Sequence, residues 1–324
     1  MYATTMTHAQ EYQALTQGAA LIDRGMGDVI RLSDADRHDF LHRMTTNAIN
    51  GLPPGRSVVT VLTSPTARIL FVFTVLARQE ELLLLPAPGQ GGALARHLRG
   101  QIFFMDKVQL QDVGNEWARL RLVGAQAATV AVACGLPAAD LKPNDWRMHE
   151  DVLALAQADY DLPGYELLVP ASQHADLRSR LLAAGATPVA SAAAEARRVE
   201  LGRPAPGAEL TEEVNPLEAG LAWTCADNKG CYTGQEIIAR QITYDKVTKS
   251  LAGLRSATLL TPGSELRVEG RSAGVVTSAA HSPALDAPIA LAIVKRPYNQ
   301  PGTTVQVVSD NATDDAQVVA LPFV

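Results

Sequence analysis

Residues 229–236 read Lys-Gly-Cys-Tyr-Thr-Gly-Gln-Glu and lie where a mixed α and β pattern gives way to β segments alone. Thr233 and Glu236 have the Thr-x-x-Glu spacing of a capping box, which predicts a helix that begins at Thr233. Isoleucines at positions 237, 238 and 242 extend that helix. No helical period follows residue 251, so the octapeptide introduces the last helix expected in the chain.

The C-terminal region predicts a small β domain. Short β-type runs, separated by Gly, Pro, Asn and Asp, cover residues 266–268, 274–278, 289–294, 304–308 and 317–321. Closely spaced short strands of this kind are typical of a β-barrel or sandwich. We therefore expect a C-terminal β-barrel over residues 251–324, with a boundary near 248–255.

The region before the octapeptide alternates strand-like and helix-like segments. Strands are expected at residues 29–32, 57–63, 69–76, 82–85, 119–123, 152–156 and 165–169. A helix is expected from Ser33, with Phe40, Leu41 and Met44 as its buried stripe. A strand-Pro-helix-Gly element covers 86–100 and recurs at 170–185. The sequence thus predicts two related α+β subdomains within residues 1–250, roughly 1–115 and 116–250 or interleaved.

The composition narrows the function classes. A chain of 324 residues with 47% hydrophobic content can form two or three domains. The net charge of −6 argues against a broad nucleic-acid surface. The longest aliphatic run, residues 82–85, is too short to span a bilayer, and residues 1–17 hold no apolar core of signal-peptide length. We expect a cytoplasmic protein without nucleic-acid or membrane partners.

Cysteine usage points to chemistry at one position. The three cysteines, Cys134, Cys225 and Cys231, form no disulfide framework and suit a reducing compartment. An iron–sulfur cluster with only cysteine ligands needs more thiolates than this chain has, and no metal site is predicted. Cys231 lies just before the expected helix N-terminus and two residues after Lys229, an arrangement that favours a thiolate. The alternative is an inert cysteine in an ordinary turn.

The octapeptide resembles the Lys-Gly-Cys-Tyr-x-Gly-Gln-Glu motif of the YgfZ family, folate-binding proteins implicated in iron–sulfur cluster assembly or repair. That family is related to the glycine-cleavage T-protein, an aminomethyltransferase, which usually lacks this cysteine. Residues 164–167, 198–200 and 215–221 are similar to the middle of the T-protein, and residues 274–278 and 321–323 to its barrel. The resemblance implies an α+β fold, with two ferredoxin-like subdomains and a C-terminal β-barrel around a central folate channel.

The same resemblance implies site residues for tetrahydrofolate. The Arg-x-Glu motif places a pterin-binding carboxylate at Glu200, because a carboxylate can accept two parallel hydrogen bonds from a pterin. The alternative for Glu200 is a solvated charge at a helix end, beside Arg197 and Arg198. Lys229 falls at a basic folate contact of the T-proteins and could also tune Cys231. Arg240 is a weaker candidate for the same folate anion.

Departures from the T-protein pattern weaken the aminomethyltransferase interpretation. Where T-proteins carry an acidic pair, this chain has Phe71 and Val72, which cannot accept a proton or stabilise a developing positive charge. The T-protein Thr-Asn-Asp segment reads Thr-Asn-Ala at 46–48. Residues 86–88 read Pro-Ala-Pro where T-proteins have a folate-contacting asparagine, which puts part of the folate site in doubt.

Three further patterns are set aside. His38 and His42 have the i, i+4 spacing of helical zinc ligands but no evident third ligand, so a solvated helix face is favoured. Residues 89–92 read Gly-Gln-Gly-Gly before a helix but lack the third glycine of a dinucleotide fingerprint. Trp223 could stack on a pterin, although its apolar run suits a core residue equally well.

The sequence leaves three hypotheses. The first is a tetrahydrofolate-binding accessory protein of iron–sulfur cluster assembly or repair, with Cys231 as a reactive or transiently ligating thiol and iron–sulfur proteins as partners. The second is a folate-dependent aminomethyl or one-carbon transferase. The third is a protein of this fold that has lost its ligand and provides only a partner surface.

Overall fold

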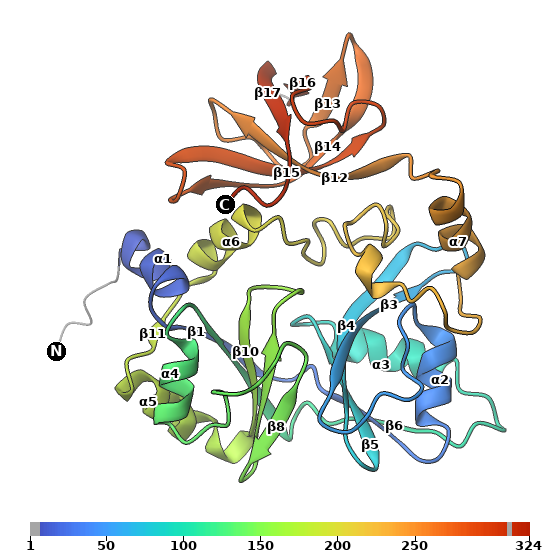
Figure 1. The fold of residues 1–324 in the computed structure, drawn as a ribbon, viewed down its shortest axis with the longest axis vertical. Helices are drawn as coiled ribbons and strands as arrows, with labels where there is room; N and C mark the ends of the chain where they lie inside the picture. Colours follow the sequence, from blue (N-terminus) through green and yellow to red (C-terminus); the bar gives the residue numbers. More distant parts are fainter. Residues whose placement is uncertain (1–6, 310–312) are drawn as a thin grey trace. The chain divides into compact units, whose positions relative to one another are not determined.

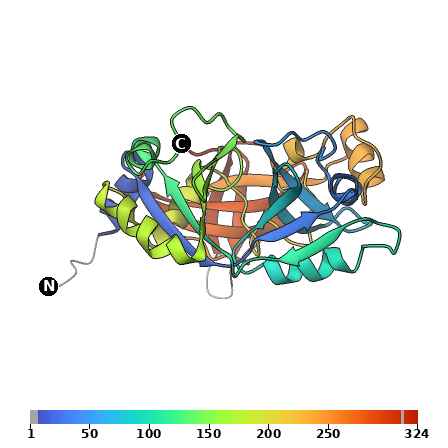
Figure 2. The same ribbon diagram turned by 90° about the horizontal axis from the view of Figure 1, so that it is seen from below.

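The computed structural model describes residues 7–309 and 313–324 (Figures 1 and 2). These residues divide into two compact units. The first comprises the chain up to residue 62, residues 71–193 and residues 226–232, and the second comprises residues 63–70, 194–225 and 233 onward. The octapeptide is therefore shared: residues 229–232 belong to the first unit and residues 233–236 to the second.

The first unit contains a five-stranded sheet with the order β3-β4-β5-β2-β6. Its strands are β2 (Ile30–Ser33), β3 (Ser57–Thr63), β4 (Ile69–Ala77), β5 (Glu81–Pro86) and β6 (Gln109–Asp112). Helices α2 (Arg37–Met44) and α3 (Gly91–Arg99) pack on this sheet. Phe40 and Leu41 of α2 are fully buried, as the predicted stripe requires.

The first unit also contains a six-stranded sheet with the order β11-β1-β7-β10-β9-β8. Its strands are β1 (Ala20–Met26), β7 (Trp117–Val123), β8 (Trp146–His149), β9 (Val152–Gln157), β10 (Gly164–Pro170) and β11 (Thr187–Pro188). Helices α1 (His8–Thr16), α4 (Ala127–Ala133) and α5 (His174–Ala183), with the short helix η1 (Ala171–Gln173), accompany it. Strand β1 precedes the five-stranded sheet in sequence but pairs with β7 and β11, so the two sheets are interleaved along the chain.

Strand β7 shows how alternation divides this sheet into two faces. Its residues 118, 120 and 122 are apolar and belong to the core shared with α4 and α5. Because successive side chains of a strand point to opposite faces, Arg119 and Arg121 occupy the other face. That face is shared with Leu153, Leu155 and Leu168, which form one apolar cluster with Leu76, Leu83 and Leu85 of the five-stranded sheet. The two sheets of the first unit therefore pack through these faces.

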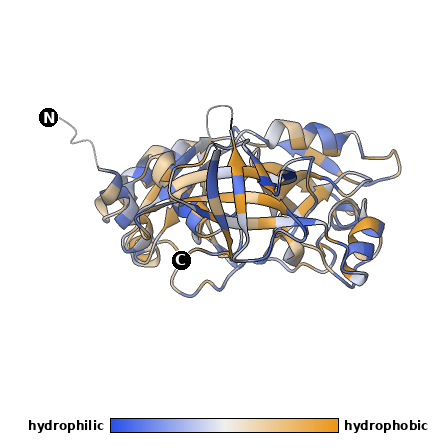
Figure 3. Ribbon diagram, turned by 90° about the horizontal axis from the view of Figure 1, so that it is seen from above, coloured by the Kyte–Doolittle hydropathy of each residue, from blue (hydrophilic) through white to orange (hydrophobic). Residues whose placement is uncertain are grey.

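The second unit contains a closed barrel with the order β12-β15-β14-β13-β16-β17. Its strands are β12 (Lys249–Ser256), β13 (Glu265–Val268), β14 (Arg271–Ser282), β15 (Ala287–Lys295), β16 (Thr304–Val308) and β17 (Thr313–Val319). Figure 3 shows hydrophobic and hydrophilic residues along these strands. The apolar residues fill the barrel and include Leu254, Leu266, Val276 and Val318. Helix α6 (Ser191–Glu200), whose last seven residues lie in this unit, contributes Val199 to a second cluster with Ile289 and Leu291. Further helical segments are η2 (Ala222–Thr224) and α7 (Gln235–Thr243).

The predicted fold class, two α+β sheets and a C-terminal β-barrel, is confirmed. Among the predicted boundaries, the start of α2 and the bounds of the last strand were wrong. Helix α2 is capped at Asp36 rather than at Ser33, because Asp34 has a φ of +80° and turns the chain out of the helix. The last strand, β17, lies earlier in the chain than the predicted residues 317–321. It pairs with β16, with Thr313 opposite Val308 at one end and Gln317 opposite Thr304 at the other. No helix in the described part of the chain is long and apolar enough to cross a bilayer.

Candidate functional site

The helix after the octapeptide begins two residues later than predicted. Helix α7 starts at Gln235, and its N-cap is Gly234, which has a φ of +83° and makes no side-chain cap hydrogen bond. The predicted Thr-x-x-Glu capping box is therefore wrong. A Cβ on Gly234 would lie 2.9 Å from Cα of Ala67, and Thr63 Oγ1 donates to the carbonyl of Thr233 at 2.6 Å. Packing of residues 63–67 against the octapeptide thus fixes a left-handed glycine at the helix start.

Cys231, three residues before Gly234, is exposed to solvent. Its side chain is exposed, whereas the following Tyr232 is 9% exposed. Helix α7 starts four residues after Cys231 in sequence, rather than two as predicted. The octapeptide therefore presents its cysteine to solvent and buries the residue beside it.

Lys229 is tied to a loop far away in sequence. Its Nζ donates to the carbonyl oxygens of His42 at 2.5 Å, of Asn47 at 2.7 Å, and of Thr45. An ammonium has three donors, so each can be matched with one of these carbonyls. Nζ also lies 4.9 Å from the ring centroid of Tyr232, a cation–π distance. We use the name clamped loop for residues 42–50, which are the last residues of α2 and the segment that follows it.

The side chain of His42 forms hydrogen bonds with the other end of the clamped loop. Its Nδ1 accepts hydrogen bonds from the backbone N–H groups of Ile49 at 3.0 Å and Asn50 at 3.1 Å. Burial, and then the positive charge of Lys229, lower the pKa of His42 against the opposing effect of Asp39. A neutral imidazole is what this acceptor role requires. Within residues 7–309 and 313–324, no group of three or more His, Cys, Asp or Glu could hold a metal ion.

Strand β3 and the chain just before the octapeptide make further hydrogen bonds to the clamped loop. Asn47 donates from Nδ2 to the carbonyl of Val59 at 2.9 Å, and its backbone N–H donates to Oγ1 of Thr60 at 3.0 Å. The carbonyl of Thr46 accepts from the backbone N–H of Ala226 at 3.1 Å. The Thr-Asn-Ala segment therefore has a structural role that links β3 to the chain leading into Lys229.

Glu200 lies in the second unit, at the end of α6, and is completely buried. Its Oε1 accepts from Oγ of Ser282 at 2.5 Å and from the backbone N–H of Ala284 at 3.3 Å. Its Oε2 accepts from Arg197 at 2.9 Å. The alternative of a solvated helix-end charge is therefore wrong. Each carboxylate oxygen of Glu200 has a partner within the same unit, and the side chain joins α6 to β14.

Arg240 also lies in the second unit, on the outer face of α7. Its side chain is 70% exposed and pairs with Glu236, one helical turn earlier, at 2.8 Å. Trp223 is 44% exposed, so its interpretation as a core residue is wrong. Lys229 and Cys231 thus both lie in the first unit, where Lys229 binds residues 42–47 and Cys231 is exposed. Glu200 and Arg240 have separate partners within the second.

The positions of the missing acidic pair carry apolar contacts. Val72 is buried, and Phe71 packs against His97 with ring centroids 5.9 Å apart. No ionisable side chain replaces the acids at these two positions of β4. The local chemistry therefore offers no proton acceptor where the T-protein pattern has one.

Sequence reasoning missed a buried charged cluster between the two sheets of the first unit. Glu166 accepts from Arg119 at 2.7 Å, from Arg24 at 2.9 Å and from Arg121 at 3.2 Å. Burial alone would raise the pKa of Glu166, but these three guanidinium groups outweigh it and lower the pKa to about 2. Asp161, which pairs with Arg24, has its pKa lowered to about 2 by the same balance. The Arg-x-Arg alternation on β7 was the available signal.

A second missed contact explains the glycine-rich segment before α3. The carboxylate of Asp28 accepts from the backbone N–H groups of Gly89 and Gly91, both at 2.7 Å. A Cβ on Gly91 would lie 2.8 Å from Cα of Asp28, so this close approach needs glycine. The protein's own carboxylate thus takes the N–H groups that a dinucleotide phosphate would need.

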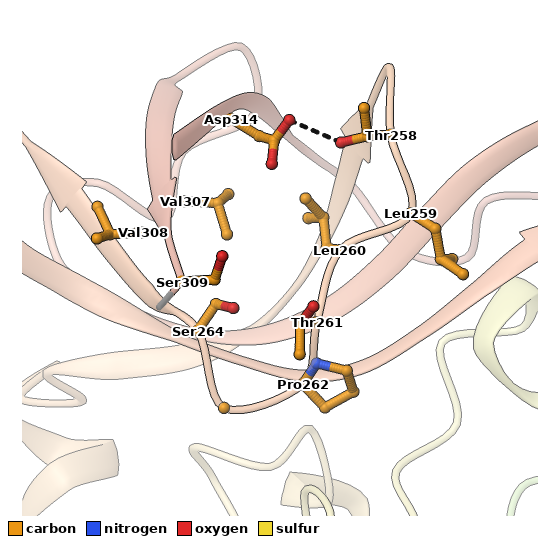
Figure 4. Close-up of a pocket in the computed structure, with 11 residues that line it drawn as sticks. Thr258, Leu259, Leu260, Thr261, Pro262, Ser264, Val307, Val308, Ser309 and Asp314 are labelled. Carbon is orange, nitrogen blue, oxygen red and sulfur yellow. Dashed lines mark hydrogen bonds between the residues drawn. The ribbon is translucent and has the colours of Figure 1, made fainter. Parts of the chain in front are cut away.

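The barrel contains a cavity of about 620 Å³ (Figure 4). It is lined by the turn at residues 258–264, by residues 307–309 and by Asp314. Oγ1 of Thr258 donates to Oδ1 of Asp314 at 2.8 Å across its rim. None of the site residues that the sequence predicts lines this cavity.

Two sheet-rich α+β parts and a closed six-stranded barrel define the T-protein-like class of fold. The crystal structure of glycine cleavage system aminomethyltransferase T from Bartonella henselae has this fold, with a TM-score of 0.90 and 24% identity over 99% of this chain and 90% of that one. Residues 2–229 match the GCVT N-terminal domain, and residues 249–324 match the glycine cleavage T-protein C-terminal barrel domain. The chain belongs to the glycine-cleavage T-protein family.

Relatives within the family differ in what they are named for. A chloroplastic protein of Arabidopsis thaliana, provisionally named a transferase, is 32% identical over 92% of this chain and 70% of its own length. The aminomethyltransferase of Desulforamulus reducens is 29% identical over 97% of this chain and 88% of its own. The mitochondrial aminomethyltransferase of Gallus gallus is 28% identical over 91% and 79%. The likeness thus extends along the whole chain.

Proposed function

We propose that this protein binds a reduced folate and acts in iron–sulfur cluster assembly or repair, as a YgfZ-type member of its family, with Cys231 as the reacting thiol. The observation that carries the proposal is the clamp made by Lys229. The ammonium of Lys229 binds the clamped loop, and Lys229 lies two residues before the exposed Cys231. These contacts hold the backbone next to the thiol in a fixed position. Lys229 acts as a positioning residue for Cys231.

Cys231 suits a transient role. Of the three free cysteines it is the exposed one, while Cys225 is buried and Cys134 is half-buried. A single accessible thiolate can donate one ligand to a cluster that passes between proteins, whereas holding a cluster needs several. Iron–sulfur proteins are therefore the proposed partners, and a reducing compartment such as the cytoplasm is the proposed location.

Folate contacts are proposed at Glu200 and Arg240 in the second unit and, separately, at Lys229 in the first, whose three donors already bind carbonyl oxygens. Glu200 is buried and charged, which suits a pterin, but both of its oxygens already accept hydrogen bonds. A pterin would have to take the place of Ser282 or Arg197 at this carboxylate. Arg240 is exposed and could attract the carboxylates of a folate tail only weakly.

Aminomethyl transfer is the second candidate, since two of the relatives are named aminomethyltransferases. Phe71 and Val72 argue against it because they remove the acidic pair from β4. The proposal therefore separates folate binding, which the family fold supports, from the transfer reaction.

Calorimetric titration with tetrahydrofolate tests the binding step. We expect saturable binding to the wild type and at least about a tenfold loss of affinity in Glu200→Gln, because a charge-assisted hydrogen bond is lost. Ser282→Ala is the matched control: it removes a protein partner of Glu200 but keeps the carboxylate, so affinity should be kept or increased. Equal affinity in the wild type and Glu200→Gln would remove Glu200 from the site, and no binding to the wild type would refute the folate proposal.

Complementation tests the role of the thiol. In cells that lack their own homologue, the wild type should restore the activity of an iron–sulfur enzyme and Cys231→Ser should not. Cys134→Ser serves as the control, since that cysteine is half-buried and outside the octapeptide. Full rescue by Cys231→Ser would contradict the proposed role. Transfer of an aminomethyl group to tetrahydrofolate by the purified protein would favour the second candidate instead.

A further inference from the structure

The segment between α3 and β6 exposes three consecutive large apolar side chains. Phe103 is 70% exposed, Phe104 is 96% exposed and Met105 is 74% exposed. Elsewhere in the described chain, no two consecutive residues are both large, apolar and exposed. Both Figure 1 and Figure 2 show this segment extending away from its own sheet. We call residues 103–105 the apolar tip.

The apolar tip is held in place by a polar turn at its base. The backbone N–H of Phe103 donates to Oδ2 of Asp106 at 2.9 Å, and the N–H of Asp106 donates back to the carbonyl of Phe103 at 2.9 Å. Arg43 of α2 donates to the other carboxylate oxygen of Asp106 at 2.6 Å. Asp36 exchanges two hydrogen bonds with the backbone of Lys107, at 2.9 and 3.0 Å. The tip is therefore presented by a fixed turn, and part of its backbone polarity is satisfied internally.

Exposed cations lie on the chain before and after the tip. Arg96, Arg99 and Lys107 are all exposed, and the structure shows none of them in an ion pair within the described residues. Residues 91–107 carry these three cations and one carboxylate, Asp106, which is bound to Arg43. Asp36 of the neighbouring segment adds a second carboxylate, which accepts from the backbone N–H of Lys107. The chain as a whole has a net charge of −6, so the net positive charge of residues 91–107 is opposite in sign to that of the whole chain.

We propose that the apolar tip and its basic base form a peripheral anchor for an anionic phospholipid bilayer. Aromatic and methionine side chains at a projecting turn can enter the interfacial region of a bilayer, while cations at the base meet anionic headgroups. A projecting tip needs a complementary pocket on a protein partner but no such pocket in a bilayer. The internally bonded turn lowers the number of polar backbone groups that insertion would strip of water.

The sequence prediction of no membrane partner rested on the lack of a spanning segment. A peripheral anchor needs only one turn and a few cations. The proposal is therefore compatible with the lack of a membrane-spanning helix in the described residues. Single weak anchors bind reversibly, so the expected association is salt-sensitive and transient.

Vesicle co-sedimentation with the full chain tests the proposal. Vesicles of phosphatidylcholine with phosphatidylglycerol should bind the wild type, and pure phosphatidylcholine vesicles should bind it at least about fivefold less, given the contribution of each surface cation. The tip variant Phe104→Ser with Met105→Ser should lower the partition coefficient about tenfold or more, because two apolar side chains are removed. The base variant, with Arg96, Arg99 and Lys107 all changed to Gln, should lose the preference for anionic lipid.

The matched control is Leu259→Ser with Tyr244→Ser, which removes two exposed apolar side chains elsewhere, 60% and 65% exposed, and should bind like the wild type. Absence of wild-type binding, or equal binding by the tip variant, would overturn the proposal. Loss of binding to a protein partner in the tip variant, without any vesicle binding by the wild type, would assign the tip to a protein surface instead. Tetrahydrofolate titration of the tip variant should be unchanged, so this result is independent of the proposed function.

Discussion

Nζ of Lys229 lies 2.7 Å from the carbonyl oxygen of Asn47, although 182 residues separate them in sequence. The same ammonium reaches His42 and Thr45, so the chain just before Cys231 is fixed to the clamped loop. Both partners lie in the first unit, and the contact is therefore part of its fold. A lysine that sequence resemblance assigns to a ligand thus has a structural task as well.

Lys229→Met should destabilise the protein, because three carbonyl oxygens lose a charged donor. We expect about 2 kcal/mol less free energy of unfolding, given that hydrogen bonds to charged groups contribute about 1.5–3 kcal/mol. Urea unfolding followed by circular dichroism measures it. Lys107→Met, at an exposed position, is the control and should leave the midpoint within error. Equal midpoints for Lys229→Met and the wild type would show that the clamp contributes nothing to stability.

Alkylation should distinguish the three cysteines. Cys231 is exposed and should react with iodoacetamide first, whereas Cys225 is buried and should react only on unfolding. Burial raises the pKa of the Cys134 thiol against the opposing effect of Arg180, so this half-buried cysteine should react slowly. Peptide mass spectrometry after timed labelling gives the order. If Cys225 were modified before Cys231 in native protein, the described surface would be incorrect.

Acid should weaken the six-stranded sheet of the first unit through Glu166, because its three arginine partners all lie on strands β1 and β7 of that sheet. The pKa of this carboxyl is lowered from 4.5 to about 2 in the fold, so its stabilising effect is complete above the unfolded pKa and is lost as the pH falls through the folded pKa. Between pH 4.5 and about 2, the wild type should therefore lose stability more steeply than Glu166→Gln. Urea midpoints at several pH values compare them. Parallel pH profiles would show that the guanidinium groups do not hold Glu166 ionised.

Two neighbouring substitutions should separate the predicted helix start from the observed one. Gly234→Ala should cost about 1–3 kcal/mol, because alanine is strained at a φ of +83° and its Cβ would meet Ala67 at 2.9 Å. Thr233→Ala should cost less than about 0.5 kcal/mol, because its side chain caps nothing. Thermal and urea unfolding measure both. A larger loss for Thr233→Ala than for Gly234→Ala would restore the capping box.

More of the fold than of the candidate site could be predicted from the sequence. Runs rich in β-type residues, such as 57–63 and 304–308, gave strands with the observed bounds, because β propensity depends on the residues of one strand. The pairing of β1 with β7 and β11 could not be found that way, since it joins Ala20 to Val123 on one side and to Thr187 on the other. The motif only proposes Glu200 as a site residue. Its partners Ser282 and Ala284 could not be predicted from the motif, since they lie at the end of β14 and just after it, far along the chain.

The sequence by itself determined the element types, the late change to an all-β region and the presence of a cysteine motif, because periodicity, turn residues and short motifs act over a few positions. Tertiary structure alone decided that Gly234 starts α7, that Lys229 holds the clamped loop and that Glu166 sits among three arginines. Each of these depends on segments brought together by folding, where close approach and burial determine which hydrogen bonds and charges are allowed.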